Sequence, residues 1–529
     1  MVCLLFIGYI SPVTDSSDEH KFWSEVCSKS ITDNVLSLGN GAKFVDRENS
    51  MAKLDKIYIR QSYIEIIDLI INQKDCANAV VTGTPGTGKT TLRNYFVHKL
   101  IGNLRVKGGK LCIIMDKSPG DFHQVHMFEA SCETDIDDSF TWTARTALKG
   151  TAMQYIIKNK FPHDCTVWIL LDVSNGDSTS RVQVNKGRTV MFTSPNEKAY
   201  KEFIKQDCLM YYLPLWSKGE ATAARSTTAV TKTIFEERWK MFPGIARVLF
   251  ASGEEFQLYK KRVSDAVNTL DAQVNFNQLG SSDSTDSIVH LLFYLDVVDG
   301  EKPNSFGKAS LIIGSNYIKT LVLERLSVQV HNDLNKVMND MRSCTVNSLK
   351  GMVLEPLALK LLGSSQWNFA VTQLGTQSGG CQLEKILFFE IARVVNCSND
   401  TNFLQMMTEE RGNTDNVMLI PHDGFPVVDA VAIMGSGEKR HYLLLQVTVA
   451  MLHAVDGKEA VKMLKKLISN AGGIERCALV YVLPNNHYFS SFKKQTLPDD
   501  CNELRQYKMS LGKCKRTNDD DPKNKKQRV

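Results

Sequence analysis

The sequence predicts an α/β protein: a parallel sheet with a helical subdomain, followed by a second α/β domain. Three observations predict this class. Residues 77–82 form a valine-rich run typical of a buried parallel strand, and helical spacing of apolar residues follows. Two further apolar runs, 167–171 and 189–192, each end in polar residues. A separate series of helix and strand patterns occupies residues 351–483, and 529 residues exceed what one core usually holds.

A glycine-rich octapeptide lies between the first strand and its helix. It reads Gly83, Thr84, Pro85, Gly86, Thr87, Gly88, Lys89 and Thr90, and the next residue is Thr91. This is the pattern of a P-loop (Walker A motif), in which glycines let backbone amides approach an anion. Lys89 supplies a charge for the outer phosphates, Thr90 supplies a hydroxyl for Mg²⁺, and the helix N-terminus adds partial positive charge. We expect these nine residues to bind ATP or GTP with Mg²⁺; a glycine-rich turn without a ligand is the alternative.

Later segments supply further candidates for this site. The run 167–171 ends in Asp172, which we expect to hold Mg²⁺ together with Thr90; a strand-to-turn aspartate is the alternative. The run 189–192 ends in polar residues 193–196, which can bond an attacking water or form a proline turn. Arg247 follows a tight turn and is expected to reach the γ-phosphate, unless it is a surface arginine. Lys89, Asp172 and Arg247 are the predicted catalytic residues.

The expected nucleotide is ATP. No Asn-Lys-x-Asp motif, which reads guanine, follows the glycine-rich octapeptide. Val173 stands where many ring-forming ATPases carry a glutamate that activates water. Hydrolysis therefore follows less directly from the sequence than binding does.

The second domain is predicted to carry a weaker candidate site. We predict helices at 351–362, 383–395 and 458–467, and strands at 417–420, 427–433, 441–448 and 477–483. Asp429 lies in one predicted strand and Gln446 in the next, a separation similar to that of the metal-site strands in restriction-endonuclease-like nucleases. Glu355 on the opening helix resembles an extra acidic residue of some members. Glu355, Asp429 and Gln446 are thus candidate ligands of a divalent metal.

This second site departs from an active nuclease at two positions. Gln446 replaces a carboxylate, and Thr448 stands where a lysine orients or deprotonates water. Lysines 462, 465 and 466 could supply that amine or could form a solvated helix face. We keep a metal-dependent nuclease as an alternative function.

Composition and charge limit the class of protein. With 43% hydrophobic residues the chain is globular, and no run approaches a membrane span. Thirteen cysteines without a Cys-x-x-Cys pair indicate neither a zinc ribbon nor a disulfide framework. Residues 1–10 are apolar but lack a basic leading segment, which favours a strand over a signal peptide. We expect no membrane association and an intracellular location.

The positive charge is concentrated at the end of the chain. Residues 513–529 contain seven basic and three acidic residues, so that +4 of the net +5 lies there. The two basic clusters predict a disordered tail that addresses the protein to the nuclear import machinery; a merely solvated tail is the alternative. We predict an N-terminal extension at 1–50, a nucleotide-binding domain at 51–335, the second domain at 345–510 and the tail at 511–529.

The ordered set of features resembles the retrotransposon hot spot (RHS) proteins of trypanosomes, which pair a P-loop ATPase with a C-terminal restriction-endonuclease-like domain. The resemblance rests on residues 83–90, 168–172, 193–195, 212–216, 242–247, Glu355, Asp429 and 446–448. The resemblance implies a nuclear protein that binds ATP or GTP and is associated with chromatin, transcription or mobile elements. The partner that it implies is nucleic acid, either DNA or RNA. Before Arg247 the chain departs from the family's two glycines and proline. A scaffold that binds nucleotide and recruits proteins remains a third possibility.

Overall fold

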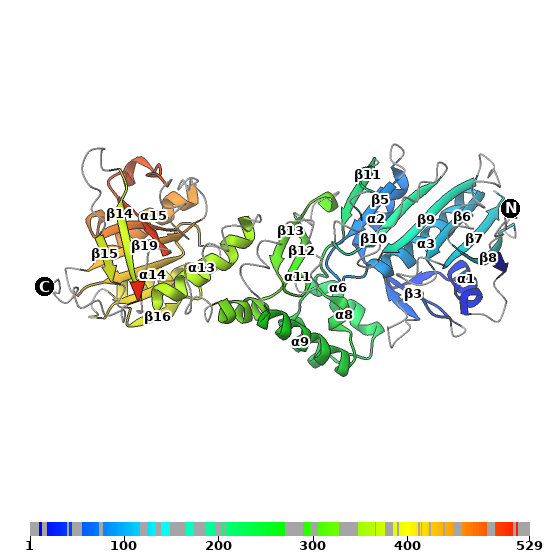
Figure 1. The fold of residues 1–529 in the computed structure, drawn as a ribbon, viewed down its shortest axis with the longest axis horizontal. Helices are drawn as coiled ribbons and strands as arrows, with labels where there is room; N and C mark the ends of the chain where they lie inside the picture. Colours follow the sequence, from blue (N-terminus) through cyan, green and yellow to red (C-terminus); the bar gives the residue numbers. More distant parts are fainter. Residues whose placement is uncertain are drawn as a thin grey trace, which may run out of the picture. The chain divides into compact units, whose positions relative to one another are not determined.

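The chain is a mixed α/β protein in a computed structural model (Figure 1). The structure describes residues 10–12, 18–39, 42–44, 55–73, 78–116, 124–133, 139–148, 165–173, 187–195, 200, 203–205, 207–269, 289–298, 305–326, 347–364, 367–375, 385–388, 391–410, 413, 415–422, 425–436, 440–448, 458–483, 492–511 and 515–516. Its contacts divide the chain into two compact units. Unit 1 comprises Met1–Ala266 and Ser282–Ile318, and unit 2 comprises Val267–Ser281 and Lys319–Val529.

Unit 1 is built on an eight-stranded sheet in the order β1-β8-β7-β6-β9-β10-β5-β11. The strands are β1 (Ile10–Pro12), β5 (Asn78–Thr82), β6 (Gly109–Asp116), β7 (Gln124–Cys132), β8 (Thr141–Leu148), β9 (Cys165–Val173), β10 (Arg188–Thr193) and β11 (Cys208–Tyr212). The run from β6 to β11 is parallel, whereas β7, β8 and β1 pair antiparallel. The predicted strands at 77–82, 167–171 and 189–192 are confirmed. The strands β9, β10 and β5 are neighbours and run parallel, so their carboxyl ends lie at the same edge of the sheet.

Apolar residues cover both faces of this sheet. On one face, Val81 packs with Trp23 of α1 (Asp18–Ser28), Ile66 of α2 (Gln61–Asn72) and Phe96 of α3 (Lys89–Lys107). On the other face, the neighbouring Val80 belongs to a second cluster of strand side chains. The alternation within β5 explains its continuous apolar run, because a central parallel strand is buried on both sides.

Two smaller groups of elements follow the sheet in unit 1. After β11 come α6 (Lys218–Ala224), η1 (Arg225–Thr227), α7 (Lys232–Met241), α8 (Ala246–Leu249) and α9 (Gly253–Asn268). A one-turn helix α11 (Val289–Leu292) leads into the antiparallel hairpin of β12 (Phe293–Val297) and β13 (Ala309–Ile313), with η2 (Ser305–Gly307) between the strands. A short antiparallel sheet joins β2 (Ile31–Thr32), β3 (Val35–Ser37) and β4 (Lys56–Tyr58).

Unit 2 contains a second large sheet in the order β15-β14-β21-β20-β19-β18-β17-β16, with β22 also paired to β14. The strands are β14 (Trp367–Gln373), β15 (Lys385–Phe388), β16 (Arg393–Asn396), β17 (Val417–Ile420), β18 (Ala430–Met434), β19 (His441–Val447), β20 (Cys477–Leu483), β21 (Arg505–Ser510) and β22 (Lys515–Arg516). The helices are α13 (Asn347–Gly363), α14 (Asp400–Glu409) and α15 (Lys458–Ala471), with η5 (Ile474–Arg476) and η6 (Asp499–Cys501). Side chains of α14 and α15 close a core over β17 to β20.

One predicted element of unit 2 is wrong. Residues 383–395 were expected to form a helix, but the structure places β15 and β16 in that segment. Its apolar residues fit a helical period, yet aromatic and β-branched side chains there also suit strands. Pairing of β15 with β14 and of β16 with β17 satisfies the backbone hydrogen bonds and decides the outcome.

Several sequence predictions concern residues that the structure describes only in part. Residues 1–9, the boundary between the two predicted domains at 336–344 and the tail from 517 onward lie outside the described residues. Within the predicted disordered tail, Lys515 and Arg516 form β22 and pair with β14. No helix among the described residues combines the length and apolar character needed to span a bilayer.

Candidate functional site

The glycine-rich loop (residues 83–90) leaves β5 and enters α3, and its backbone requires glycine at position 88. Gly88 has a φ of 107°, in the left-handed region that L side chains rarely adopt. A Cβ at that position would lie 2.1 Å from Tyr63 Oη, and Gly83 faces the backbone carbonyl of Leu213 in the same way. Backbone and aromatic groups therefore closely surround the loop, and they leave no space for a side chain at positions 83 and 88.

Lys89 and Thr87 hold the loop in its turn. Lys89 begins α3, and its ammonium donates to the carbonyl oxygens of Gly83 at 2.6 Å and Thr84 at 3.1 Å. The Thr87 hydroxyl donates to the Thr84 carbonyl at 2.8 Å. The predicted phosphate-binding lysine thus lies over the loop itself. Pro85 is half-buried in the loop, and Thr91 occupies the first turn of α3.

Thr90 and Asp172 come together from segments that are distant in the sequence. Thr90 Oγ1 donates to Asp172 Oδ2 at 2.6 Å, although 82 residues separate them. Asp172 lies near the end of β9 and is only 3% exposed. A buried carboxylate beside a threonine hydroxyl at a helix N-terminus is a pair of oxygen donors that suits Mg²⁺. The sequence predicted this pair, and its two members are in direct contact.

Thr193 and Arg247 lie beside the same edge. Thr193 ends β10, between β5 and β9, and its buried hydroxyl donates to the Ser194 carbonyl at 3.2 Å. The Arg247 backbone amide donates to the Gly86 carbonyl at 3.1 Å, while its side chain is exposed. The turn before Arg247 is therefore anchored on the glycine-rich loop.

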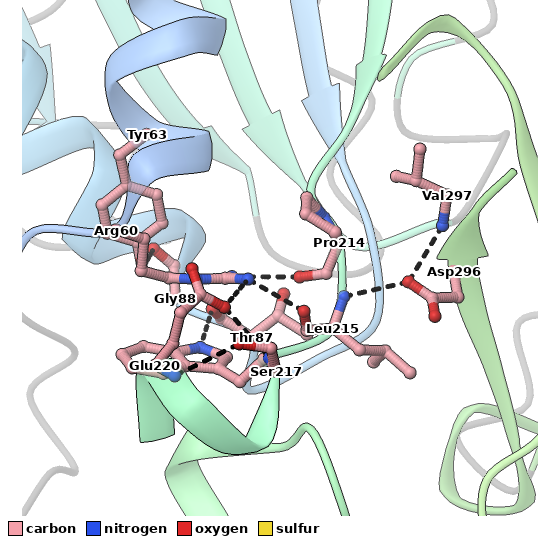
Figure 2. A network of polar contacts seen from close by, with 11 residues as sticks. Arg60, Tyr63, Thr87, Gly88, Pro214, Leu215, Ser217, Glu220, Asp296 and Val297 are labelled. Atoms are coloured by element: carbon pink, nitrogen blue, oxygen red, sulfur yellow. Dashed lines mark hydrogen bonds and ion pairs between the residues drawn. The ribbon is translucent and has the colours of Figure 1, made fainter. Parts of the chain in front are cut away.

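Four residues hold the loop from outside, two of them by direct hydrogen bonds, and Figure 2 labels three of the four: Arg60, Tyr63 and Glu220. The fourth, Trp216, is the one that the sequence analysis named, within the segment 212–216. Tyr63 Oη donates to the Gly88 carbonyl at 3.2 Å, and Trp216 Nε1 donates to the Thr87 carbonyl at 2.8 Å. The Arg60 guanidinium lies 4.8 Å from the Trp216 ring centre and forms an ion pair with Glu220 at 3.1 Å. We call Arg60, Tyr63, Trp216 and Glu220 the Arg60 clamp.

Only part of this clamp has a signal in the sequence. Ser217-x-x-Glu220 is a capping box, and both of its hydrogen bonds are present at the start of α6. The motif predicts the helix start. It does not predict that Glu220 also accepts from Arg60, which is 160 residues away in sequence.

The hairpin of β12 and β13 is attached to the loop at a second point. Leu295 donates its amide to the Thr84 hydroxyl at 2.7 Å, and that hydroxyl donates to the Leu295 carbonyl at 3.1 Å. Asp296 accepts from the amides of Leu215 and Val297 (Figure 2). Thr84 therefore joins the hairpin to the loop directly.

His290 is a further residue of this region that the sequence did not indicate. It lies in α11, immediately before β12. Burial, together with the nearby charge of Lys89, lowers the pKa of His290 to about 4. The imidazole is therefore neutral at pH 7, and it adds no positive charge beside Lys89.

In unit 2, the three predicted metal-site residues interact. Gln446 Nε2 donates to Asp429 Oδ2 at 2.9 Å, and the Val447 amide donates to the same oxygen at 2.6 Å. Asp429 immediately precedes β18, where the sequence predicted it inside the strand, and its amide donates to the Leu445 carbonyl. Burial, and then the charge of Glu355 on α13, raise the pKa of Asp429 to about 7. We call Glu355, Asp429 and Gln446 the carboxylate cluster.

The lysines proposed as a substitute base lie on a solvated face. Residues 462, 465 and 466 are exposed on α15, whose opposite face buries Leu464 and Leu467, and Lys465 forms an ion pair with Asp500. Among the described residues, no group of three or more His, Cys, Asp or Glu side chains is arranged to hold a metal ion. The carboxylate cluster thus offers two carboxylates and one amide.

Comparison with known proteins gives a partial match only. No protein-family model matches the chain. Crinkler effector proteins 15 and 16 of Phytophthora infestans are each 26% identical to it over 204 residues. The match covers 38% of this chain and 29% of each relative. The chain is thus similar to less than a third of the length of these effector proteins, and the match assigns it to no family.

Proposed function

We propose that unit 1 is a P-loop domain that binds Mg²⁺ and ATP at the glycine-rich loop and hydrolyses the nucleotide. The observation that carries the proposal is the 2.6 Å contact between Thr90 and Asp172. A hydroxyl that follows the loop lysine and a carboxylate at the end of a nearby parallel strand form the protein half of a Mg²⁺ site in such domains. The sequence predicts the same role for both residues.

The residues around the loop fit the chemistry of a triphosphate. The amides of the loop and the start of α3 suit an anion, Lys89 adds a full positive charge, and Thr90 with Asp172 would hold Mg²⁺. When bound, Mg²⁺ neutralises charge on the outer phosphates. Thr193 is a candidate for orienting the attacking water and Arg247 for contact with the γ-phosphate.

The test is direct titration of wild-type protein and Lys89→Ala with Mg²⁺ and a non-hydrolysable ATP analogue. We expect wild-type protein to bind and Lys89→Ala to lose at least tenfold in affinity, because a charge contact to phosphate is removed. Lys99→Ala, in the same helix and half-buried, is the matched control. Equal affinity of wild type and Lys89→Ala would refute the proposal.

The cellular role is proposed on the RHS resemblance and the basic tail. We propose a nuclear protein whose ATP-dependent domain acts with nucleic acid, since +4 of the net charge of +5 lies in residues 513–529. The partial similarity to Crinkler effector proteins leaves an effector role open for the whole protein. Measuring ATP turnover with and without DNA and RNA tests the partner: stimulation by one polynucleotide supports this role, and negligible turnover with either favours a recruiting scaffold.

A second candidate function is a metal-dependent nuclease in unit 2. The observation that favours it is the carboxylate cluster, in which Asp429 has a pKa of about 7 because of burial and Glu355. A bound divalent cation would offset the charge that these two carboxylates impose on each other. The amide of Gln446 in place of a carboxylate and the threonine at position 448 weaken the resemblance to active nucleases.

The nuclease candidate has its own test. Purified protein is incubated with DNA and RNA in Mg²⁺ and in Mn²⁺, beside Asp429→Ala and the exposed control Asp415→Ala. Cleavage that requires metal, survives Asp415→Ala and disappears in Asp429→Ala would support it. Absence of cleavage with either metal would remove it and leave the ATPase proposal untouched.

A further inference from the structure

Two consecutive peptide groups of the glycine-rich loop are held by side chains from outside the loop. The Trp216 indole donates to the Thr87 carbonyl at 2.8 Å, and the Tyr63 hydroxyl donates to the Gly88 carbonyl at 3.2 Å. In a trans peptide the carbonyl and the next amide point in opposite directions. Fixing the carbonyls of Thr87 and Gly88 therefore also fixes the directions of the Gly88 and Lys89 amides.

Arg60 in turn fixes the Trp216 side chain. Its guanidinium lies 4.8 Å from the Trp216 ring centre and 5.6 Å from that of Tyr63. It donates to the carbonyls of Pro214 at 3.0 Å and Leu215 at 2.8 Å, the two residues before Trp216. One planar cation, the guanidinium of Arg60, therefore holds both the backbone before Trp216 and the ring of Trp216.

The charges of this arrangement are balanced. Arg60 is 1% exposed, so its charge requires a partner, and both oxygens of Glu220 accept from it, at 3.2 Å and 3.1 Å. Burial raises the pKa of Tyr63 to about 12, so its hydroxyl remains a donor at any working pH. Each residue of the Arg60 clamp thus has a defined partner. Two of them, Tyr63 and Trp216, donate hydrogen bonds to the loop.

We propose that Trp216 is a positioning residue for the proposed nucleotide site and that Arg60 acts through it. The clamp keeps the loop amides directed for phosphate binding before the nucleotide arrives, so that ordering the loop costs little on binding. This role rests on the proposed nucleotide binding by the same loop. Asp296 accepts from Leu215, so the segment that carries Trp216 also connects the loop to the β12–β13 hairpin.

The experiment compares two tryptophan variants. Trp216→Phe keeps an aromatic ring beside Arg60 and removes the N–H that bonds Thr87. Trp239→Phe is the matched control, because Trp239 of α7 packs on the same apolar cluster through Phe235. Affinity for Mg²⁺ and a non-hydrolysable ATP analogue is measured by calorimetry, and unfolding of the nucleotide-free proteins is followed by circular dichroism.

We expect Trp216→Phe to weaken binding roughly threefold to tenfold, the effect of one lost hydrogen bond, and Trp239→Phe to leave it within about twofold. The melting temperatures of Trp216→Phe and Trp239→Phe should be similar. A merely structural role of Trp216 would not explain a loss of affinity without a loss of thermal stability. Tyr63→Phe, which removes one oxygen, should weaken binding to a similar extent, and Tyr95→Phe in α3 is its control. Arg60→Lys should also weaken binding, since an ammonium cannot reproduce the planar fork.

The outcomes separate this inference from the proposed function. If wild-type protein does not bind the analogue, both are overturned. If wild-type protein binds and Trp216→Phe binds equally well, the positioning role fails while nucleotide binding stands. If Trp216→Phe does not fold, Tyr63→Phe decides: unchanged affinity there overturns the clamp.

Discussion

At the scale of single residues, two aspartates of the chain differ through their neighbours. Asp172 is buried and accepts from the Thr90 hydroxyl at 2.6 Å. Asp429 accepts from an amide side chain and a backbone amide, but burial and the charge of Glu355 outweigh these bonds and raise its pKa to about 7. Aspartate therefore belongs to both candidate sites, but its neighbour is a hydroxyl donor in one and a second carboxylate in the other.

Asp429→Asn should change how stability depends on pH. The ordinary pKa of this carboxyl is 3.8, whereas burial and Glu355 raise it to about 7 in the folded protein. The folded state thus keeps a proton that the unfolded chain releases, and the resulting stabilisation is full below about pH 4 and lost as pH rises to 7. Between pH 4.5 and 7.5, wild-type unit 2 should lose roughly 1–3 kcal/mol of unfolding free energy relative to Asp429→Asn.

Urea unfolding at several pH values measures this difference. Asp415→Asn, at an exposed position of the same unit, is the control and should follow wild type across the range. Parallel pH profiles of wild type and Asp429→Asn would show that the folded pKa is not raised.

At the scale of elements, the turn from β5 into α3 depends on the backbone of Gly88. Its φ of 107° is strained for any other residue, and the space for a Cβ is filled by the Tyr63 hydroxyl. Gly102, in the middle of α3, is the opposite case: a Cβ there meets no atom within 4 Å. A glycine that the loop requires therefore precedes α3 at its N-cap, and the interior of α3 contains a glycine that the helix only tolerates.

Gly88→Ala and Gly102→Ala should consequently have opposite effects. We expect Gly88→Ala to destabilise unit 1 by about 1–3 kcal/mol and to reduce nucleotide binding, because the turn and Tyr63 must both move. Gly102→Ala should stabilise it by about 0.5–1 kcal/mol through helix propensity, with binding unchanged. Thermal unfolding and analogue titration of both variants check this; stabilisation by Gly88→Ala would contradict the loop geometry.

At the scale of the whole molecule, the chain contains two compact units with separate cores. Residues of α1, α2 and α3 close one face of the first sheet, and residues of α14 and α15 close one face of the second. The glycine-rich loop and its clamp belong to unit 1, while the carboxylate cluster belongs to unit 2. The two candidate activities can therefore be tested in one protein by separate substitutions.

Calorimetric unfolding should show two transitions. Saturating Mg²⁺ and ATP analogue, at about 100 times Kd, should stabilise only unit 1, by about 2.7 kcal/mol, and raise its transition by several degrees. Lys89→Ala should abolish this shift. An equal rise of both transitions would mean that the nucleotide does not act on unit 1 alone.

The local features of both sites were predictable from the sequence. The strand at β5, the glycine-rich loop and the carboxylate at the end of β9 follow from apolar runs and glycine spacing, which act over a few residues. In unit 2, the proximity of Asp429 and Gln446 was expected from the resemblance of their separation to that of the metal-site strands in restriction-endonuclease-like nucleases. The segment 383–395 was not predictable, because its pattern suits a helix as well as a strand and pairing with distant strands decided between them.

The sequence by itself determined where the loop lies and which oxygen donors belong with it, since motif spacing and strand periodicity are local properties of the chain. Only the tertiary structure decided what holds the loop: Tyr63 and Trp216 bond to it, Trp216 across 129 residues, and Arg60 holds Trp216. It also decided the pKa of Asp429, which depends on burial and on Glu355. The physical reason is that contacts and desolvation between distant segments arise only when the whole chain is folded.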